Sequence, residues 1–233
     1  MLQRPDRERA AGLPSVMAQR DSRPRSAIGF TVKSGWAAVV LLEGPLPSPR
    51  VVDSRRIELS DPAVPESRQP YHADFGTPRA AGPELSRLLR TVHRMGTRSV
   101  TAVIRHYAAV GHEVVGAGVV VGSLIDPERI GNAHIRIHAR EGQLFRQVVE
   151  DAAAAGGVRC SVWRQRDLYG VAADMLKRSE PSLVAAATSL GKAVAGGWRT
   201  EQKAAAVAAW LMLADSFRGA RPRRRVGEKP DVA

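Results

Sequence analysis

The sequence has a single cysteine and no long apolar run, and each scarcity excludes a class of protein. One cysteine, Cys160, among 233 residues excludes an internal disulfide and a cysteine-based zinc cage. We interpret it as a small core residue at the start of a strand. No window reaches the roughly 18 consecutive apolar residues of a membrane span, and residues 1–26 contain no apolar signal-peptide core. The sequence therefore predicts a cytoplasmic protein without a membrane partner.

The formal net charge is +12, and more than half of it lies in two terminal segments. Residues 1–26 carry +3 and residues 216–233 carry +4, so subtraction from +12 leaves +5 for residues 27–215. Both segments are rich in Arg, Pro and Ala, which predicts disordered basic tails around one domain at 27–215. Such tails would hold nucleic acid electrostatically, although an Ala/Arg coding bias produces the same composition. Met17 offers an alternative start.

Apolar periodicity predicts an α/β domain that opens with a three-stranded meander. The predicted strands of this meander are Ile28 to Lys33, Trp36 to Leu42 and Val51 to Leu59. The elements expected after it are a helix at 83–96, a strand at 99–107, a helix at about 132–155, a strand at 158–163 and helices at 168–178, 181–194 and 200–215. Helices are thus expected to flank a sheet of five strands.

A Val-rich run after residue 112 contains three glycines, Gly116, Gly118 and Gly122. A dinucleotide-binding loop would place such glycines between a strand and a helix. Here the apolar strand pattern continues beyond them. We therefore interpret the glycines as points where two backbone segments approach closely or where a strand bulges.

Four short stretches carry a resemblance to a known family. They are "IGFT" at 28–31, "SGWAAVV" at 34–40, "AREGQLFRQVVEDAAAAGGV" at 139–158 and "KAAAVAA" at 203–209. With the order of the elements, they resemble the RNase H-like superfamily, and within it the RuvC and YqgF branch of Holliday-junction resolvases. The resemblance implies an RNase H-like mixed sheet of five strands, with an antiparallel meander followed by parallel strands.

The resemblance also implies where catalytic carboxylates would stand, since nucleases of this fold hold two Mg²⁺ ions with three or four acids. The corresponding positions here are Thr31, Arg105 or His106, Lys203 and Ala206. None is an acid, and Glu201 is turned about 160° away from Lys203 on a helix. Basic groups cannot chelate Mg²⁺ but do bind phosphate. We therefore expect no catalytic residue, and the candidate nucleic-acid contacts are Thr31, Lys33, Arg105, His106 and Lys203.

The helix expected at 132–155 carries a second candidate site, because His134, His138 and Glu141 follow one another at i, i+4 and i+7. At 100° per residue, Glu141 lies near the centre of the apolar face. A carboxylate there must be paired, hydrogen-bonded, metal-bound or protonated. Two interpretations stay open. Either the three residues bind a divalent metal, aided by His106, or Glu141 accepts hydrogen bonds from a neighbouring Arg or strand amide and the histidines border solvent.

Three functional hypotheses follow from these patterns. The leading one is a non-catalytic RNase H-like domain that binds nucleic acid or a protein partner and needs no cofactor. The first alternative is a metal-dependent enzyme built on His134, His138 and Glu141. The second is an interaction protein without a nucleic-acid role. The sequence leaves the oligomeric state open.

Overall fold

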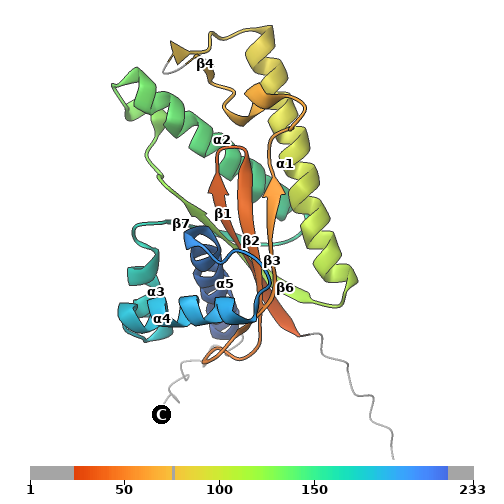
Figure 1. Cartoon of the computed structure of the whole chain (residues 1–233), viewed down its shortest axis with the longest axis vertical. Helices are drawn as coiled ribbons and strands as arrows, with labels where there is room; N and C mark the ends of the chain where they lie inside the picture. The colour runs from red at the N-terminus through yellow and green to blue at the C-terminus, as the bar shows by residue number, and fades with distance from the viewer. Residues whose placement is uncertain (1–23, 75–76, 220–233) are drawn as a thin grey trace, which may run out of the picture.

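A five-stranded mixed sheet forms the centre of the computed structural model, which describes residues 24–74 and 77–219 (Figure 1). The strands, in the order β3-β2-β1-β6-β7, are β3 (Arg50–Glu58), β2 (Trp36–Glu43), β1 (Arg25–Lys33), β6 (Glu113–Val121) and β7 (Cys160–Arg164). β1 pairs antiparallel with β2 and parallel with β6, and β6 pairs parallel with β7. The predicted α/β class, the meander and the parallel addition are confirmed.

Helices cover both faces of this sheet (Figure 1). α1 (Pro83–Ala109) and α2 (Ala133–Ala155) pack on one face, whereas α3 (Leu168–Leu176), α4 (Glu180–Leu190) and α5 (Thr200–Gly219) cover the other. The short elements are η1 (Pro65–Arg68), β4 (His72–Asp74), β5 (Thr77–Pro78), η2 (Pro127–Arg129) and η3 (Gly191–Ala193). No helix in the described ranges is long and apolar enough to cross a membrane.

The fourth strand is not where the sequence predicted it. Residues 99–107 belong to α1, which continues through Gly96 to Ala109. The buried side chains of α1 recur at helical spacing along its whole length: Leu88, Val92, Val100, Val103, Ile104 and Tyr107. Gly96 does not end the helix. It packs against the Val148 side chain of α2, and a Cβ at position 96 would overlap that side chain. The Val-rich run supplies the fourth strand instead, as β6.

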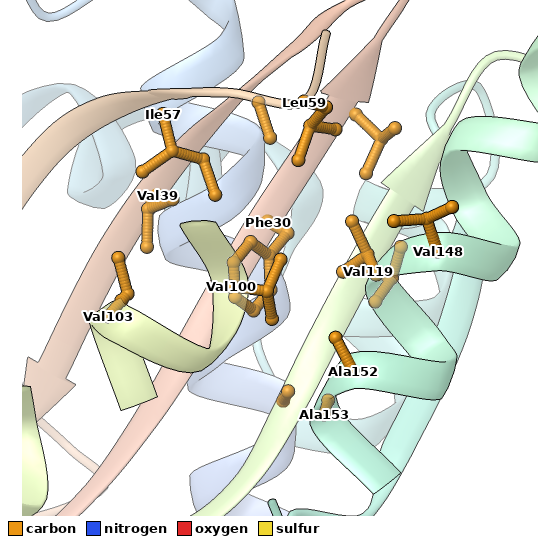
Figure 2. Packing of buried hydrophobic residues seen from close by; sticks show 14 of the residues in the cluster. Phe30, Val39, Ile57, Leu59, Val100, Val103, Val119, Val148, Ala152 and Ala153 are labelled. Atoms are coloured by element: carbon orange, nitrogen blue, oxygen red, sulfur yellow. The ribbon is translucent and has the colours of Figure 1, made fainter. Parts of the chain in front are cut away.

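The core between the sheet and the helix pair α1 and α2 is made of aliphatic and aromatic side chains. Figure 2 shows Phe30 and Val119 of the sheet facing Val100 of α1 and Val148 of α2. Phe30, Val100, Val119 and Val148 are fully buried. Burial of this apolar area provides the main free energy that seats the two helices on the sheet.

On the opposite face, α5 lies close to the sheet because small residues meet at the contact. A Cβ at Gly29 of β1 would overlap the carbonyl oxygen of Ala205, and one at Gly118 of β6 would lie 2.6 Å from that of Ala208. The Ala-rich middle of α5 is buried throughout. The interpretation as a point of close backbone approach is therefore confirmed for Gly118, whereas among the described residues no atom beyond its chain neighbours lies within 4 Å of a Cβ built at Gly122.

The ends of the described domain extend beyond the boundaries expected from the sequence. β1 begins at Arg25, and α5 continues to Gly219. Residues 25–26 and 216–219 are therefore parts of regular elements. Residues 1–23, including Met17, and residues 220–233 lie outside the described residues.

Cys160 opens β7 and is partly buried, and burial raises the pKa of its thiol to about 11. At pH 8, on the order of one thiol in a thousand is then ionised, and only the thiolate reacts. We expect Ellman's reagent to modify Cys160 roughly a hundredfold more slowly in the native protein than in guanidinium chloride, where the pKa returns to about 8.5. Stopped-flow absorbance measures both rates. Equal rates would contradict the buried environment.

Candidate functional site

The first candidate region lies at the carboxyl end of β1, where the strand meets the first turn of α5. Thr31 is buried, and its hydroxyl donates a 2.8 Å hydrogen bond to the carbonyl oxygen of Glu201. Lys33 Nζ lies 3.8 Å from Glu201 Oε1 and donates to Gln165 Oε1 at 3.3 Å. Thr31 therefore links the strand to the helix, and Lys33 contacts groups from two neighbouring elements.

Glu201 faces the sheet, and Lys203 does not. The α5 residues in contact with the glycines of the sheet are Ala205, Ala208 and Met212, and Glu201 precedes Ala205 by one turn on the same line of the helix. Lys203 is partly exposed and lies about 160° round the helix from Glu201. The sequence analysis aligned Lys203 with the acid position, whereas in the structure it is Glu201 that contacts Thr31 and Lys33 of β1.

Arg105 and His106 lie at the other end of the sheet from Thr31. Both are exposed near the carboxyl end of α1, which leads into β6 where Glu113 pairs with Arg25 at the start of β1. The prediction that they end the fourth strand is wrong, because α1 takes in residues 99–107. The expected phosphate-binding set is thereby divided between two ends of the molecule.

Among the described residues, the carboxyl ends of the central strands bring no three acids together closely enough to share a metal ion. β6 ends at Val121, and Gly122 and Ser123 follow it. Within residues 24–74 and 77–219, a single group of three or more His, Cys, Asp or Glu side chains is close enough to share a metal ion, and it lies elsewhere. Glu201 is thus one carboxylate paired with Lys33. These residues do not fit a two-magnesium centre.

The group that does gather consists of His72, His134 and His138, which we call the histidine cluster. One candidate ligand atom from each residue lies within 4.8 Å of the others. His72 opens β4, and the other two lie one turn apart in α2, where the Asn132 side chain caps the helix by accepting from the Ile135 N–H. The Nε2 atoms of His134 and His138 are 3.3 Å apart.

The loop that carries His72 is held in place by Arg79. The Arg79 guanidinium donates to the carbonyl oxygens of His72 at 2.8 Å and of Pro70 at 3.0 Å. These two bonds fix the backbone on both sides of Tyr71. His72 therefore approaches α2 from a braced segment of chain, and its side chain is mostly buried.

Glu141 is fully buried behind the cluster, as its place on the apolar face of the helix predicted. Its Oε1 lies 2.8 Å from Nδ1 of His72, and its Oε2 lies 3.8 Å from Nδ1 of His138. Burial raises the pKa of the Glu141 carboxyl, whereas the hydrogen bond and charge of His72 and a backbone hydrogen bond from Tyr71 act in the opposite direction. Among the described residues, Oε2 has no hydrogen-bond partner.

His138 is biased toward its neutral form. Partial burial lowers the pKa of the His138 imidazole, and the charges of His72 and His134 lower it further. A neutral imidazole keeps one ring nitrogen with a free lone pair. His138 therefore presents a nitrogen acceptor more readily than a positive charge.

Sequence reasoning missed His72, because no local spacing connects it with α2. It stands in a Pro-rich segment expected to be a loop, and only the fold brings it to Glu141. The one sequence signal was indirect, since a carboxylate in an apolar stripe requires a donor from another element. His106, which was expected to assist the metal site, is exposed on α1 and is outside the cluster.

No protein-family model and no curated protein matches the sequence. Among solved structures, the chain is similar to RuvC of Thermus thermophilus in complex with a Holliday junction substrate, with a TM-score of 0.52 at 9% identity over 84% of this chain and 96% of that chain. A second structure of Thermus thermophilus RuvC gives a TM-score of 0.52 at 9% identity over 83% and 96%. The chain therefore has the RuvC-like form of the RNase H-like fold.

Proposed function

We propose that this protein is a non-catalytic RNase H-like protein that binds the phosphate backbone of nucleic acid through α1. The observation that carries the proposal is a row of exposed arginines on the outer side of this helix, which we call the arginine face: Arg87, Arg94, Arg98 and Arg105. At 100° per residue, the four lie within about 40° of one another, and they span about 27 Å along the axis.

The arginine face has the charge and length that a phosphate backbone requires. Of its four members, only Arg94 forms an ion pair within the described residues, with Asp61 at 3.4 Å. Arg90 and His93, both exposed, flank the row. A guanidinium group binds phosphate through two parallel hydrogen bonds. A row of about 27 Å corresponds to about eight base pairs at 3.4 Å per step.

Two further observations support the proposal. The carboxyl end of β1 holds Thr31 bonded to α5 and one carboxylate paired with Lys33, which does not fit two-metal hydrolysis. The Thermus thermophilus RuvC of the same fold is described with a Holliday junction substrate, so four-way junctions are a first nucleic acid to test beside duplex DNA and RNA. The alternative is a protein partner, and it would be favoured if none of the tested nucleic acids binds.

Neutralising the arginine face is expected to weaken nucleic-acid binding. For the full-length triple variant Arg94→Gln, Arg98→Gln and Arg105→Gln, affinity at roughly 0.1 M salt should fall about tenfold or more. The slope of log K against log salt should shrink by about one per lost phosphate contact. Fluorescence anisotropy with a labelled junction, duplex and RNA, at about 50 to 200 mM salt, measures both quantities.

A matched control removes the same charge from the opposite side of the sheet, in the full-length triple variant Lys177→Gln, Lys192→Gln and Arg199→Gln. All three residues are exposed. The control should retain the slope and most of the affinity. An equal loss in both triples would place binding on diffuse charge or on the chain outside the described residues. No binding by the wild type would sink the proposal.

The same proposal predicts no cleavage with Mg²⁺ or Mn²⁺ of junctions, RNA–DNA hybrids or single strands. Among the described residues, Glu201 belongs to no group of three or more acidic or histidine side chains close enough to share a metal ion, and it pairs with Lys33, so it does not fit a site for two ions. Denaturing gels of labelled substrates check this result. A cleavage activity that copurifies with the protein and disappears in Glu201→Gln would show that the carboxyl end of β1 is an active site after all.

A further inference from the structure

We propose that the histidine cluster binds one divalent metal ion, with zinc preferred, through His72, His134 and His138. In this proposal Glu141 does not bind the metal but orients His72 and His138 from behind. The assignment goes beyond nucleic-acid binding and concerns a different part of the molecule. It also differs from the triad of His134, His138 and Glu141 that was one of the two interpretations of the sequence, because His72 takes the place of Glu141 as the third ligand.

The spacing of the ring nitrogens suits a tetrahedral ion. Zinc–nitrogen bonds of about 2.0 to 2.1 Å at tetrahedral angles place two ligand nitrogens about 3.3 Å apart. The Nε2 atoms of His134 and His138 are already 3.3 Å apart. One candidate ligand atom from each of the three rings lies within 4.8 Å of the others, so the ring of His72 is near enough to join the pair.

Glu141 has the contacts of a carboxylate that supports metal-binding histidines. A histidine bound to zinc commonly donates its other ring N–H to a carboxylate, which fixes the tautomer and the ring orientation. Here Oε1 of Glu141 lies 2.8 Å from Nδ1 of His72, which leaves Nε2 of that ring as the free ligand atom. The same carboxylate thus determines which nitrogen of His72 can face a metal.

The second oxygen of Glu141 provides an independent indication. Oε2 is buried, has no hydrogen-bond partner among the described residues, and lies 3.8 Å from Nδ1 of His138. A buried unpaired carboxylate oxygen costs free energy. When a metal draws Nε2 of His138 inward, a small rotation of the ring brings its Nδ1–H to Oε2. One buried carboxylate would then support two of the three ligands.

The chemistry of the ligand set favours zinc over magnesium or calcium. Imidazole nitrogens suit Zn²⁺ and related transition ions, whereas Mg²⁺ and Ca²⁺ prefer oxygen ligands. Three protein ligands leave a fourth position for water or another ligand. The three histidines line one cleft together with Glu66, Arg68, Gln69 and Asp74. Bound metal would also tie β4 to α2, because His72 and the other two ligands come from these separate elements.

The experiment uses full-length protein purified without a polyhistidine tag, stripped with EDTA and reloaded with Zn²⁺ or Co²⁺. We expect one metal per chain by plasma mass spectrometry and a Co²⁺ spectrum with visible bands of four-coordinate geometry. His72→Ala, His134→Ala and His138→Ala should each weaken Zn²⁺ binding at least a hundredfold in calorimetry. Glu141→Gln should weaken it about ten- to a hundredfold, the range usual for such supporting groups.

His93→Ala and His106→Ala are the matched controls, since both histidines are exposed on α1 outside the cluster, and both variants should bind Zn²⁺ like the wild type. His134 and His138 are exposed, so their double alanine variant decides the question even if His72→Ala does not fold. Zinc binding that survives in the double variant, or that falls equally in the controls, would overturn the site. Unchanged affinity in Glu141→Gln would overturn the role given to Glu141.

Discussion

Alanine at Gly29 is expected to lower the free energy of unfolding by about 3 kcal/mol or more, at or beyond the upper end of ordinary overpacking. The new Cβ would overlap the carbonyl oxygen of Ala205, and backbone cannot move aside as a flexible side chain does. α5 would have to lift from β1 and expose its buried alanine face. Urea denaturation followed by circular dichroism measures the change.

Gly142→Ala is the matched control for this substitution. Gly142 lies in α2 with open space around it, so a Cβ there meets nothing. Alanine should raise the stability by about 0.5 to 1 kcal/mol, because it restricts the unfolded chain and favours the helix. If Gly29→Ala and Gly142→Ala had similar effects, α5 would not lie against β1 as described.

The antiparallel meander could be predicted from the sequence because its signals are local. Alternation in β1 and the apolar run of β2 belong to single strands, and each pattern indicates a strand without knowledge of its neighbours. The resemblance supplied two parallel strands after the meander, but the first of them was placed at 99–107, whereas the structure forms it as β6. The likeness to RuvC structures then showed that this arrangement is the fold.

The error in α1 shows how tertiary packing overrides a local preference. Residues 99–104 read Ser-Val-Thr-Ala-Val-Ile, a run rich in β-branched residues that favours a strand. The buried positions Val92, Val100 and Val103 nevertheless continue one helical face through Gly96, and α2 packs against it. A pattern taken across Gly96 would have favoured one long helix. Gly96 was interpreted as the end of a helix, whereas it lies inside α1 and allows close contact with α2.

That single error also displaced part of the candidate site. Arg105 and His106 were aligned with a strand end, and the long helix carries them to the far end of the sheet. Glu141 was oriented correctly, because its direction depends only on 100° steps within one helix. His72 could not be found in this way, since its position depends on how the loop folds back on α2.

Removing the carboxylate of Glu141 is expected to destabilise the metal-free protein. Glu141→Ala leaves the ring N–H of His72 and the amide of Tyr71 without their acceptor in a buried place, which should cost about 1 to 3 kcal/mol. Glu141→Gln keeps an acceptor oxygen of nearly the same shape and should cost less than Glu141→Ala. Urea denaturation in EDTA gives both values without any contribution from metal binding.

Glu150→Ala serves as the control on the same helix, since Glu150 forms a partly exposed i, i+4 pair with Arg146. Its loss should cost only about 0.3 to 0.5 kcal/mol. If Glu141→Ala costs no more than Glu150→Ala, the contact with His72 is not formed in solution. If Glu141→Ala lowers the free energy of unfolding in EDTA, and lowers it further relative to the wild type when zinc is added, one carboxylate both holds the loop of His72 and supports the metal. The further loss would follow because zinc stabilises only folded chains that bind it.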